Sequence, residues 1–221
     1  LFRKPLVKIN KNILIHVIGI GGIGMSGIAE ILSDMRYHVQ GSDININSNI
    51  LRLNKKNIKT FKGHKQENLK NVNLIVYSTA VKKSNIELKF AKKHKIPSIT
   101  RAEILSQIVK LKNSIAISGS HGKTTTTSLI SSILNAAKMN PTVINGGIIN
   151  QFGTNTRLGS GKWMVVEADE SDGTFVKLPS TIAVVTNIDK EHLDFYKNYN
   201  NLLVQFKKFI AQVPFYGFSI V

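Results

Sequence analysis

The sequence contains no cysteine in its 221 residues, so disulfide bonds and thiolate metal sites are excluded. This absence is compatible with a reducing compartment. Acidic residues are also scarce, because 13 Asp and Glu stand against 30 Lys and Arg, giving a net charge of +17. Arginine, the usual base-reading residue, is rare, and the lysines are scattered in stretches such as 52–65 and 91–95. We therefore expect a lysine-rich solvated surface and no nucleic-acid partner.

Long apolar runs are missing too. No uninterrupted stretch could span a bilayer, so we expect no membrane partner and a cytoplasmic location. Residues 1–29 imitate a signal peptide, with a basic start and an apolar continuation. His16 and five closely spaced glycines in the apolar part argue against that interpretation. The chain opens on leucine, so we expect that its true start is missing.

Short apolar runs alternate with segments of helical periodicity along the whole chain, which predicts an α/β fold with parallel sheets. Residues 84–95 are expected to form a helix with Ser84 and Glu87 in capping-box positions. A break near residues 110–114 predicts two domains, 1–111 and 112–221. The expected strands are 13–20, 37–43, 73–79, 96–100, 114–118, 141–145, 163–169, 181–187 and 215–221. The other expected helices are one in which Ile28, Ile31, Leu32 and Met35 recur at helix spacing, and 102–112, 123–138 and 200–211.

The segment ISGSHGKTTTTSLI, residues 117–130, lies where a phosphate loop must lie, after a strand and before a helix. Gly119 and Gly122 allow backbone N–H groups to turn around an oxyanion, and the helix dipole favours the same place. Lys123 is expected to reach the β- and γ-phosphates, and the Thr124 hydroxyl to ligate magnesium. The match to the longer phosphate-loop pattern is incomplete, because Ile117 stands where glycine would be needed. The alternative is a threonine-rich helix start.

Acidic side chains follow two of the later strands. Glu167 and Asp169 end one strand, at the edge where parallel sheets bind ligands, and their hard oxygens suit magnesium. A second cluster follows the next strand. Each cluster alone is typical of a solvated strand end, but together with the loop of Lys123 they favour a metal-bound triphosphate. The second cluster contains Asn187, Asp189, His192 and Asp194.

The first domain carries its own glycine motif, GIGGIG at residues 19–24, directly after a strand and before a helix. Asp43 closes the second strand, near the spacing of a ribose-binding carboxylate. The motif predicts a nucleotide diphosphate, and a tight strand-to-helix turn is the alternative. His64 has the surroundings of a surface histidine and on its own favours a structural role.

Taken in order, GIGGIGMSGIAEIL, GSD, VYSTAV, IPSITRAEIL, SGSHGKTTTT, EADESDGTF and TNIDKEHLDFY resemble the Mur ligases from about Ile13 to the last residue. The likeness is greatest to members that join L-alanine to UDP-N-acetylmuramate. It implies a Rossmann-like domain for the UDP-sugar, followed by a central P-loop ATPase domain. It also implies that a C-terminal amino-acid-binding domain is absent and that the central domain is incomplete.

The resemblance assigns residues to each substrate. The UDP-sugar would contact Gly21, Gly22, Ile23, Gly24, Asp43, His64, Ser78 and Thr79. ATP would contact Gly119, Ser120, His121, Gly122, Lys123, Thr124, Thr125 and Asn187, with Ser120 standing where threonine is usual. Lys123, Glu167 and His192 would be catalytic, and Thr124, Glu167 and His192 would hold Mg²⁺.

The implied chemistry is ATP-dependent amide formation. The lactyl carboxylate of the UDP-sugar attacks the γ-phosphate, and the amine of L-alanine then attacks the acyl phosphate. Three alternatives stay open: a ligase that attaches a peptide to the same sugar, a non-catalytic nucleotide-binding fragment, and a nicotinamide-dependent dehydrogenase. The dehydrogenase leaves Lys123 and Glu167 without a task.

Overall fold

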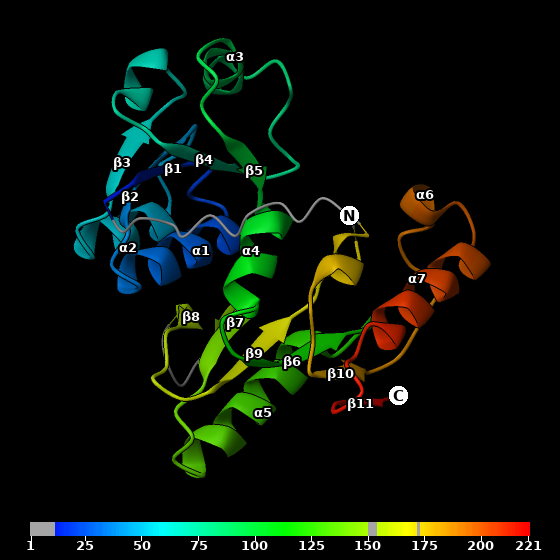
Figure 1. The fold of residues 1–221 in the computed structure, drawn as a ribbon. Coiled ribbons are helices and arrows are strands. Elements are labelled where there is room, and N and C mark those ends of the chain that lie inside the picture. The colour runs from blue at the N-terminus through cyan, green and yellow to red at the C-terminus, as the bar shows by residue number, and fades with distance from the viewer. Residues whose placement is uncertain (1–11, 150–153, 172) are drawn as a thin grey trace. The chain divides into compact units, whose positions relative to one another are not determined.

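The computed structural model describes residues 12–149, 154–171 and 173–221 (Figure 1). The chain forms two compact units, which divide between Ile99 and Thr100. Each unit is an α/β sandwich built on its own sheet. None of the helices in the described ranges has the length and hydrophobicity that a bilayer crossing requires.

The first unit is built around a five-stranded sheet with the order β3-β2-β1-β4-β5. The recorded pairings of β1 with β2 and β4, and of β2 with β3, are all parallel. Parallel strands place their carboxyl ends, and the loops that follow them, at one edge. The elements are β1 (Leu14–Ile18), α1 (Ile23–Asp34), β2 (His38–Asp43), α2 (Ser48–Lys55), β3 (Lys59–Lys62), η1 (Gln66–Leu69), β4 (Leu74–Tyr77), α3 (Ile86–Lys93) and β5 (Ser98–Thr100).

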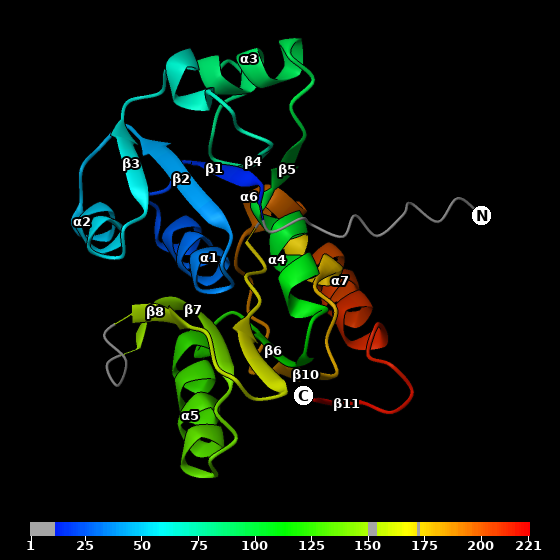
Figure 2. The same ribbon diagram turned by 60° about the vertical axis from the view of Figure 1, so that its left-hand side comes forward.

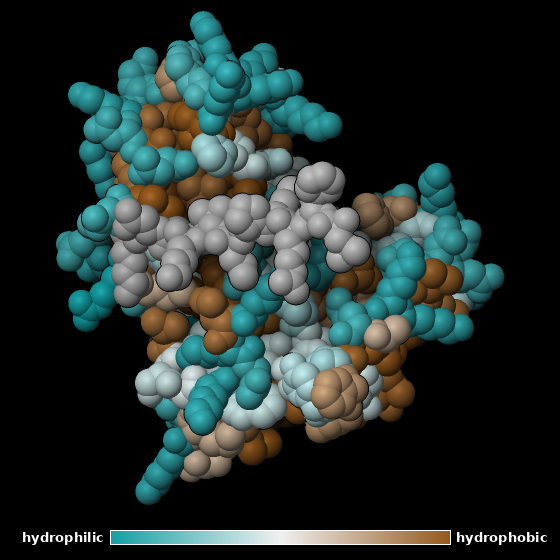
Figure 3. Space-filling model, viewed as in Figure 1, coloured by the Kyte–Doolittle hydropathy of each residue, from teal (hydrophilic) through white to brown (hydrophobic). Residues whose placement is uncertain are grey.

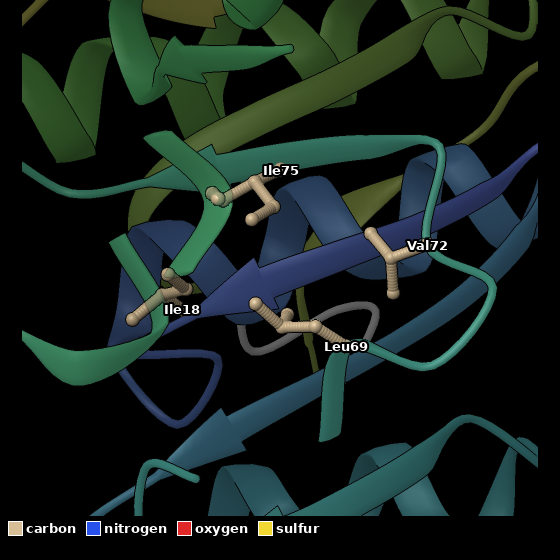
Figure 4. Close-up of a cluster of buried hydrophobic side chains, with 5 residues drawn as sticks. Ile18, Leu69, Val72 and Ile75 are labelled. Atoms are coloured by element: carbon tan, nitrogen blue, oxygen red, sulfur yellow. The ribbon is translucent and has the colours of Figure 1, made fainter. Parts of the chain in front are cut away.

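An apolar cluster holds α3 and η1 against the sheet. Ile18 and Ile75 on neighbouring strands meet Leu69 and Val72, and Ala91 of α3 completes the group (Figure 4). All five are at least 93% buried. Truncating one of the isoleucines to alanine would cost about 2–5 kcal/mol of stability. The outer face of α3 is hydrophilic (Figure 3).

The turns that lead from a helix back into a strand share one device in the first unit. Each contains a non-glycine residue with positive φ, the region that L-residues other than Asn and Asp seldom enter. The four residues are Arg36, Asn57, Asn71 and Lys95, with φ of 69°, 60°, 63° and 56°. These turns lie at the amino edge of the sheet, opposite the glycine loop.

The second unit contains a six-stranded sheet with the order β11-β10-β6-β9-β7-β8, in which only the β7–β8 pairing is antiparallel. Helix α5 packs against β6, β7 and β9 (Figure 2). The elements are α4 (Arg101–Val109), β6 (Asn113–Ser118), α5 (Lys123–Ala136), β7 (Thr142–Ile149), β8 (Thr154–Arg157), β9 (Trp163–Glu167), η2 (Thr174–Lys177), β10 (Ile182–Val185), α6 (Leu193–Tyr196), α7 (Tyr199–Ala211) and β11 (Phe218–Ile220).

Two apolar groups stabilise this unit. Ile115, Ile117, Val165 and Val184 are at least 92% buried in the centre of the sheet. On its other side, the rings of Phe206 and Phe209 from α7 lie with their centroids 5.1 and 5.3 Å from that of Phe175. The fully buried pair Phe206 and Phe209 anchors α7.

The α/β class predicted from the sequence is confirmed, and the recorded pairings of the first sheet are parallel as expected. The second sheet is mixed, because β8 pairs with β7 in the antiparallel direction. The predicted cap of the helix at residues 84–95 is wrong. Asn85, not Ser84, caps α3, because its side-chain oxygen accepts the N–H groups of Glu87 and Leu88. The Glu87 carboxylate is therefore free to turn inward. A true capping box forms instead at Thr100 and Glu103.

The domain boundary predicted at residues 111/112 stays a prediction. The two compact units divide earlier in the sequence, so that α4 belongs to the second unit. Helix α4 packs on η2, and its Ser106 hydroxyl donates to the Lys177 carbonyl.

Candidate nucleotide-binding site

The loop between β6 and α5 has a shape that requires glycine at both ends. Gly119 has φ of 137°, and a Cβ there would come within 2.1 Å of the Thr186 hydroxyl. Gly122 has φ of 79° and caps α5, which begins at Lys123. The N-terminus of a 14-residue helix therefore opens directly onto the loop, as an anion site needs.

The segment after β10 fixes the loop from behind. Asn187 accepts from the backbone N–H groups of Ser120 and His121, through its carbonyl at 3.1 Å and its side-chain oxygen at 2.9 Å. Its side-chain nitrogen donates to the His121 carbonyl. The Ser120 hydroxyl in turn accepts from the Asp189 N–H at 2.8 Å. Asn187, predicted to contact ATP, thus shapes the loop.

Lys123 lies across its own loop. Its ammonium donates to the carbonyls of Gly119 and Ser120, at 2.5 and 3.1 Å, and to Glu170 Oε1 at 2.9 Å. Glu170 is 99% buried, and its Oε2 has no hydrogen-bond partner among the residues that the structure describes. Burial raises the pKa of Glu170, although its hydrogen bond with Lys123 opposes the rise. The lysine is thus held at the mouth of the loop by a carboxylate that sequence reasoning missed.

Thr124 and Glu167 come together as predicted for a metal site. The Thr124 hydroxyl donates to Glu167 Oε2 at 3.0 Å, and the N–H of Gly146 donates to the same oxygen at 2.9 Å. A hydroxyl and a carboxylate, both hard oxygen donors, therefore sit side by side one residue from Lys123. This donor set fits Mg²⁺.

His192 belongs to a different group of side chains. Its Nε2 lies 3.6 Å from Glu170 Oε1, and Glu170, Glu191 and His192 each offer a ligand atom within 4.8 Å of the others. No recorded contact in the described part of the chain joins His192 to Glu167. Of the three predicted metal ligands, Thr124 and Glu167 contact each other, whereas His192 lies beside Glu170.

The remaining residues predicted near ATP take smaller parts. Asp169 closes a local turn by accepting the Ser171 N–H at 2.9 Å. Burial raises the pKa of Asp169, but the hydrogen bonds from Ser171 and the charges of Arg101 and Lys123 bring it below its ordinary value. Thr125 is exposed. His121 is also exposed, and its Nε2 lies 3.2 Å from Asp189 Oδ2 and 3.6 Å from Glu191 Oε1.

The glycine loop of the first unit is already engaged with its neighbours. The N–H of Gly21 donates to Asp43 Oδ2 at 2.8 Å, and the N–H of Gly22 donates to the Gly19 carbonyl at 3.1 Å. The Gly21 carbonyl accepts from the side chains of Asn47 and Asn49. Ile23 and Gly24 begin α1, so the motif does join a strand to a helix end.

His64 lies at the same edge and is not the surface histidine expected from the sequence. Its side chain is only 15% exposed, and its Nδ1 lies 2.9 Å from Ser42 Oγ and 3.1 Å from Glu87 Oε2. Ser78 and Thr79 follow β4 at this edge, where the Ser78 hydroxyl accepts the Ala80 N–H. The four predicted segments of the UDP-sugar site thus follow the ends of the neighbouring strands β1, β2, β3 and β4.

Sequence reasoning missed two buried carboxylates that contact the predicted site residues, Glu170 beside Lys123 and Glu87 beside His64. Glu170 stands in EADESDG among four acidic residues, and no spacing rule says which of them turns toward the loop. Glu87 was assigned to a helix cap. The available signal was its neighbour Asn85, which is the better capping residue and leaves the carboxylate for another role.

A hollow of about 750 Å³ lies at the opposite edge of the second sheet, near the amino ends of β6 and β10. Lys110, Lys112 and Lys162 line it together with Tyr216. It contains none of the predicted site residues. The chemistry-bearing residues gather at the carboxyl edge instead, as the topology dictates.

Comparison with known families matches both units. The model described as "Mur ligase family, catalytic domain" matches residues 14–113, and the model described as "Mur ligase middle domain" matches residues 117–221. The chain belongs to the Mur ligase family. The border between the two matches lies close to residues 111/112.

Curated relatives give the same family. The chain is 56% identical to the UDP-N-acetylmuramate–L-alanine ligase of Brucella anthropi over 208 residues, covering 94% of this chain and 44% of that protein. It is 56% identical to the ligase of the same name from Allorhizobium ampelinum, covering 97% and 46%. The chain thus spans somewhat under half the length of these relatives.

Two solved structures share the fold. One is the UDP-N-acetylmuramate:L-alanyl-gamma-D-glutamyl-meso-diaminopimelate ligase from Neisseria, with a TM-score of 0.88 and 26% identity over 94% of this chain and 70% of that one. The other is the UDP-N-acetylmuramate-alanine ligase from Thermotoga maritima, with a TM-score of 0.86 and 30% identity over 91% and 48%.

Proposed function

We propose that this chain supplies the sugar-nucleotide and ATP sites of a cytoplasmic ligase that joins L-alanine to the lactyl carboxylate of UDP-N-acetylmuramate, in peptidoglycan precursor synthesis. The observation that carries the proposal is the grouping of Lys123, Thr124 and Glu167 at the N-terminus of α5. The curated relatives at 56% identity, which carry that activity in their names, support the choice of substrate.

The residues of the second unit have different roles in binding ATP. The backbone of 119–122 and the start of α5 bind the phosphates, while Lys123 leaves its loop carbonyls to neutralise charge on the transferred phosphoryl group. Thr124 and Glu167 would hold Mg²⁺. When bound, the metal ion neutralises charge on the β- and γ-phosphates. Asn187 keeps the loop in shape throughout.

The reaction proceeds in two balanced steps. A carboxylate oxygen of the sugar forms a bond to the γ-phosphorus as the bond to ADP breaks, giving an acyl phosphate. The amine of L-alanine then attacks the carbonyl carbon, inorganic phosphate leaves and the amine loses a proton. The protein must exclude water between the steps, because an acyl phosphate hydrolyses.

The first unit presents the UDP-sugar. We assign its phosphates to the helix start at Ile23 and Gly24, and its nucleoside to the edge formed by Asp43, His64, Ser78 and Thr79. This assignment rests on the shared carboxyl edge of β1, β2, β3 and β4.

The proposal can be tested with a chimera. A chimera would join residues 1–221 to the remaining C-terminal portion of the Brucella anthropi ligase. We expect it to release phosphate from ATP only when UDP-N-acetylmuramate, L-alanine and Mg²⁺ are all present. The 221-residue chain itself should bind UDP-N-acetylmuramate and a non-hydrolysable ATP analogue by calorimetry.

Binding of neither nucleotide by the chain would contradict the proposal. Binding of both without turnover by the chimera would favour the non-catalytic fragment. Tight binding of NADH in a fluorescence titration, with none of the ATP analogue, would favour the dehydrogenase.

A second candidate is the attachment of a peptide to the same sugar. It is favoured by the TM-score of 0.88 to the Neisseria ligase. Supplying a tripeptide in place of L-alanine discriminates the two when the full-length protein containing this chain is assayed. The 56% identity to alanine-adding relatives makes L-alanine the expected substrate.

A further inference from the structure

A connected group of polar side chains is buried in the first unit, beneath the edge that carries His64. His16, Ser42 and Glu87 have no solvent exposure, and Gln40 and Asn68 are 7% exposed. The group comes from β1, β2, η1 and α3, on the sheet face covered by α3. Burying so many polar groups costs stability unless every one is paired, so their arrangement is informative.

One backbone carbonyl fixes the direction of the first hydrogen bonds. Gln40 Nε2 lies 2.7 Å from the Asn68 carbonyl, which can only accept, so this atom is the amide nitrogen of the side chain. The same nitrogen lies 3.3 Å from His16 Nδ1. Because an amide nitrogen only donates, His16 Nδ1 must accept, and the ring carries its hydrogen on Nε2.

The hydrogen on His16 Nε2 then settles the next pair. This nitrogen faces Ser42 Oγ at 3.3 Å and Glu87 Oε1 at 3.5 Å. Ser42 Oγ lies 2.6 Å from Glu87 Oε2, a distance typical of a hydroxyl donating to a carboxylate. The Ser42 hydrogen is thus used on Glu87, and Ser42 Oγ is left as an acceptor.

Glu87 collects donors on both oxygens. Besides Ser42, Asn68 Nδ2 donates to Oε1 at 2.8 Å and the N–H of Lys65 donates to it at 3.3 Å. Burial raises the pKa of Glu87, but hydrogen bonds from His16, Ser42 and Asn68 outweigh burial and bring it below its ordinary value. The carboxylate is therefore ionised and only accepts.

His64 meets two acceptors as a result. Its Nδ1 lies 2.9 Å from Ser42 Oγ and 3.1 Å from Glu87 Oε2, so Nδ1 must carry a hydrogen. No hydrogen bond or ion pair to Nε2 is recorded among the described residues. Nε2 is thus the nitrogen left to meet a ligand, on the one ring of this group that reaches solvent.

The position of His64 connects the buried group to the nucleotide edge. Ser42 precedes Asp43, whose carboxylate accepts the Gly21 N–H and whose carbonyl accepts the N–H of Gly63. The glycine loop and His64 therefore lie on either side of the end of β2. A rotation of the His64 ring would therefore alter the surface to which we assign the UDP-sugar.

We propose that Glu87 is a positioning residue for the sugar nucleotide: it fixes His64 as the Nδ1–H tautomer and thereby presents Nε2 to the bound ligand. The role rests on the proposed UDP-sugar site of the first unit. If the network were only structural, Glu87 would stabilise the fold of the unit, and its effect on ligand binding would not depend on His64.

The tautomers can be measured directly in the wild-type chain. Nitrogen-15 NMR of labelled histidine should show His64 hydrogenated on Nδ1 and His16 on Nε2. Among the signals of the six histidines, that of His64 is the one that a His64→Gln variant lacks. The opposite tautomer of His64 would overturn the proposal. This measurement requires no substitution at a buried site. Addition of UDP-N-acetylmuramate should shift the His64 Nε2 resonance.

A double-mutant cycle separates positioning from structure. We expect Glu87→Gln and His64→Gln each to weaken binding of UDP-N-acetylmuramate to the 221-residue chain about tenfold, as loss of one charge-assisted hydrogen bond would. In the His64→Gln background, Glu87→Gln should have no further effect. The exposed Glu67→Gln is the matched control and should leave the Kd unchanged. Affinity for an ATP analogue should be unchanged in all variants.

The outcomes distinguish the two proposals. If the wild-type chain does not bind UDP-N-acetylmuramate, the proposed function of the first unit and the role of Glu87 both fail. If it binds and the two substitutions act additively, Glu87 acts through the fold alone and only the positioning role is overturned.

Discussion

The two glycine loops of the chain follow the same plan and differ in what surrounds them. Both join a parallel strand to a helix, but Gly22 caps α1 with an ordinary φ of −64°, whereas Gly122 caps α5 with φ of 79°. The second loop has a lysine, a hydroxyl and two carboxylates beside it, and the first has Asp43 bonded to its own Gly21. The two glycine patterns therefore form similar turns from strand to helix, and the side chains around each turn make the two loops chemically different.

The largest effect expected from this comparison is on catalysis. Lys123→Ala should lower the rate of ligation by the chimera by about 10³-fold, because it removes the charge that balances the transferred phosphoryl group. Binding of UDP-N-acetylmuramate should be unchanged, since we assign that site to the other unit. The ligation rate is measured by phosphate release, and binding of UDP-N-acetylmuramate is measured by calorimetry. Wild-type turnover in the variant would refute the role of the loop.

The shape of the second loop predicts the next largest effect. Gly119→Ala should destabilise the second unit by about 3 kcal/mol, because φ of 137° is strained for alanine and the new Cβ meets the Thr186 hydroxyl. Trp163, the sole tryptophan, reports on this unit, so urea unfolding followed by its fluorescence gives the change. A stability equal to wild type would contradict the loop geometry.

The buried carboxylate of Glu87 in the first unit should contribute less to stability than Gly119 does, and its contribution should depend on pH. Glu87→Gln should cost about 2 kcal/mol at pH 7 through its lost charge-assisted hydrogen bonds. Because folding lowers the pKa of Glu87 from 4.5, its contribution is present above pH 4.5 and is lost as pH falls through the folded-state pKa.

The intensity of the native His16 NMR signal in increasing urea gives the free energy of unfolding of the first unit. It is measured at a series of pH values from 7 down into the acid range, for wild type and for Glu87→Gln. The difference between wild type and Glu87→Gln should shrink below pH 4.5. A difference that grows with acidification would show that the sign is wrong.

The smallest effects form a matched pair at the two helix caps. Gly122→Ala should cost about 1.5 kcal/mol, because alanine is disfavoured in the left-handed region, although the space around it is open. Gly22→Ala should cost about 0.5 kcal/mol, because its backbone suits any residue. Trp163 fluorescence reports the first and the His16 signal the second. Equal costs would remove the distinction between the two loops.

The sequence was sufficient for the features that depend on local pattern. Apolar runs and glycine–lysine–threonine chemistry predicted the strands around the second loop, its helix start at Lys123, and the pairing of Thr124 with Glu167. Periodicity could not reveal α2, β3 or β8, because these elements are short or polar. Their stability comes from packing on neighbours rather than from their own propensity.

The parts of the site that sequence reasoning missed are long-range. Whether Glu167, Asp169 or Glu170 turns toward Lys123 depends on how the chain bends after β9. Glu87 reaches Ser42 and His64 across 45 and 23 positions of sequence. Such pairings are set by the topology of the sheet, which no residue spacing encodes. The same long-range contacts bury most of the His64 side chain, although its own segment, KGHKQEN, has the composition of a surface loop.

The left-handed turns of the first unit offer room for engineering. Arg36 and Lys95 adopt a backbone shape that glycine holds with less strain, so exchanging either for glycine should relax the turn. These turns stand at the far rim from His64 and the glycine loop. An affinity tag or a reporter dye could be attached there without altering the rim to which we assign the ligand.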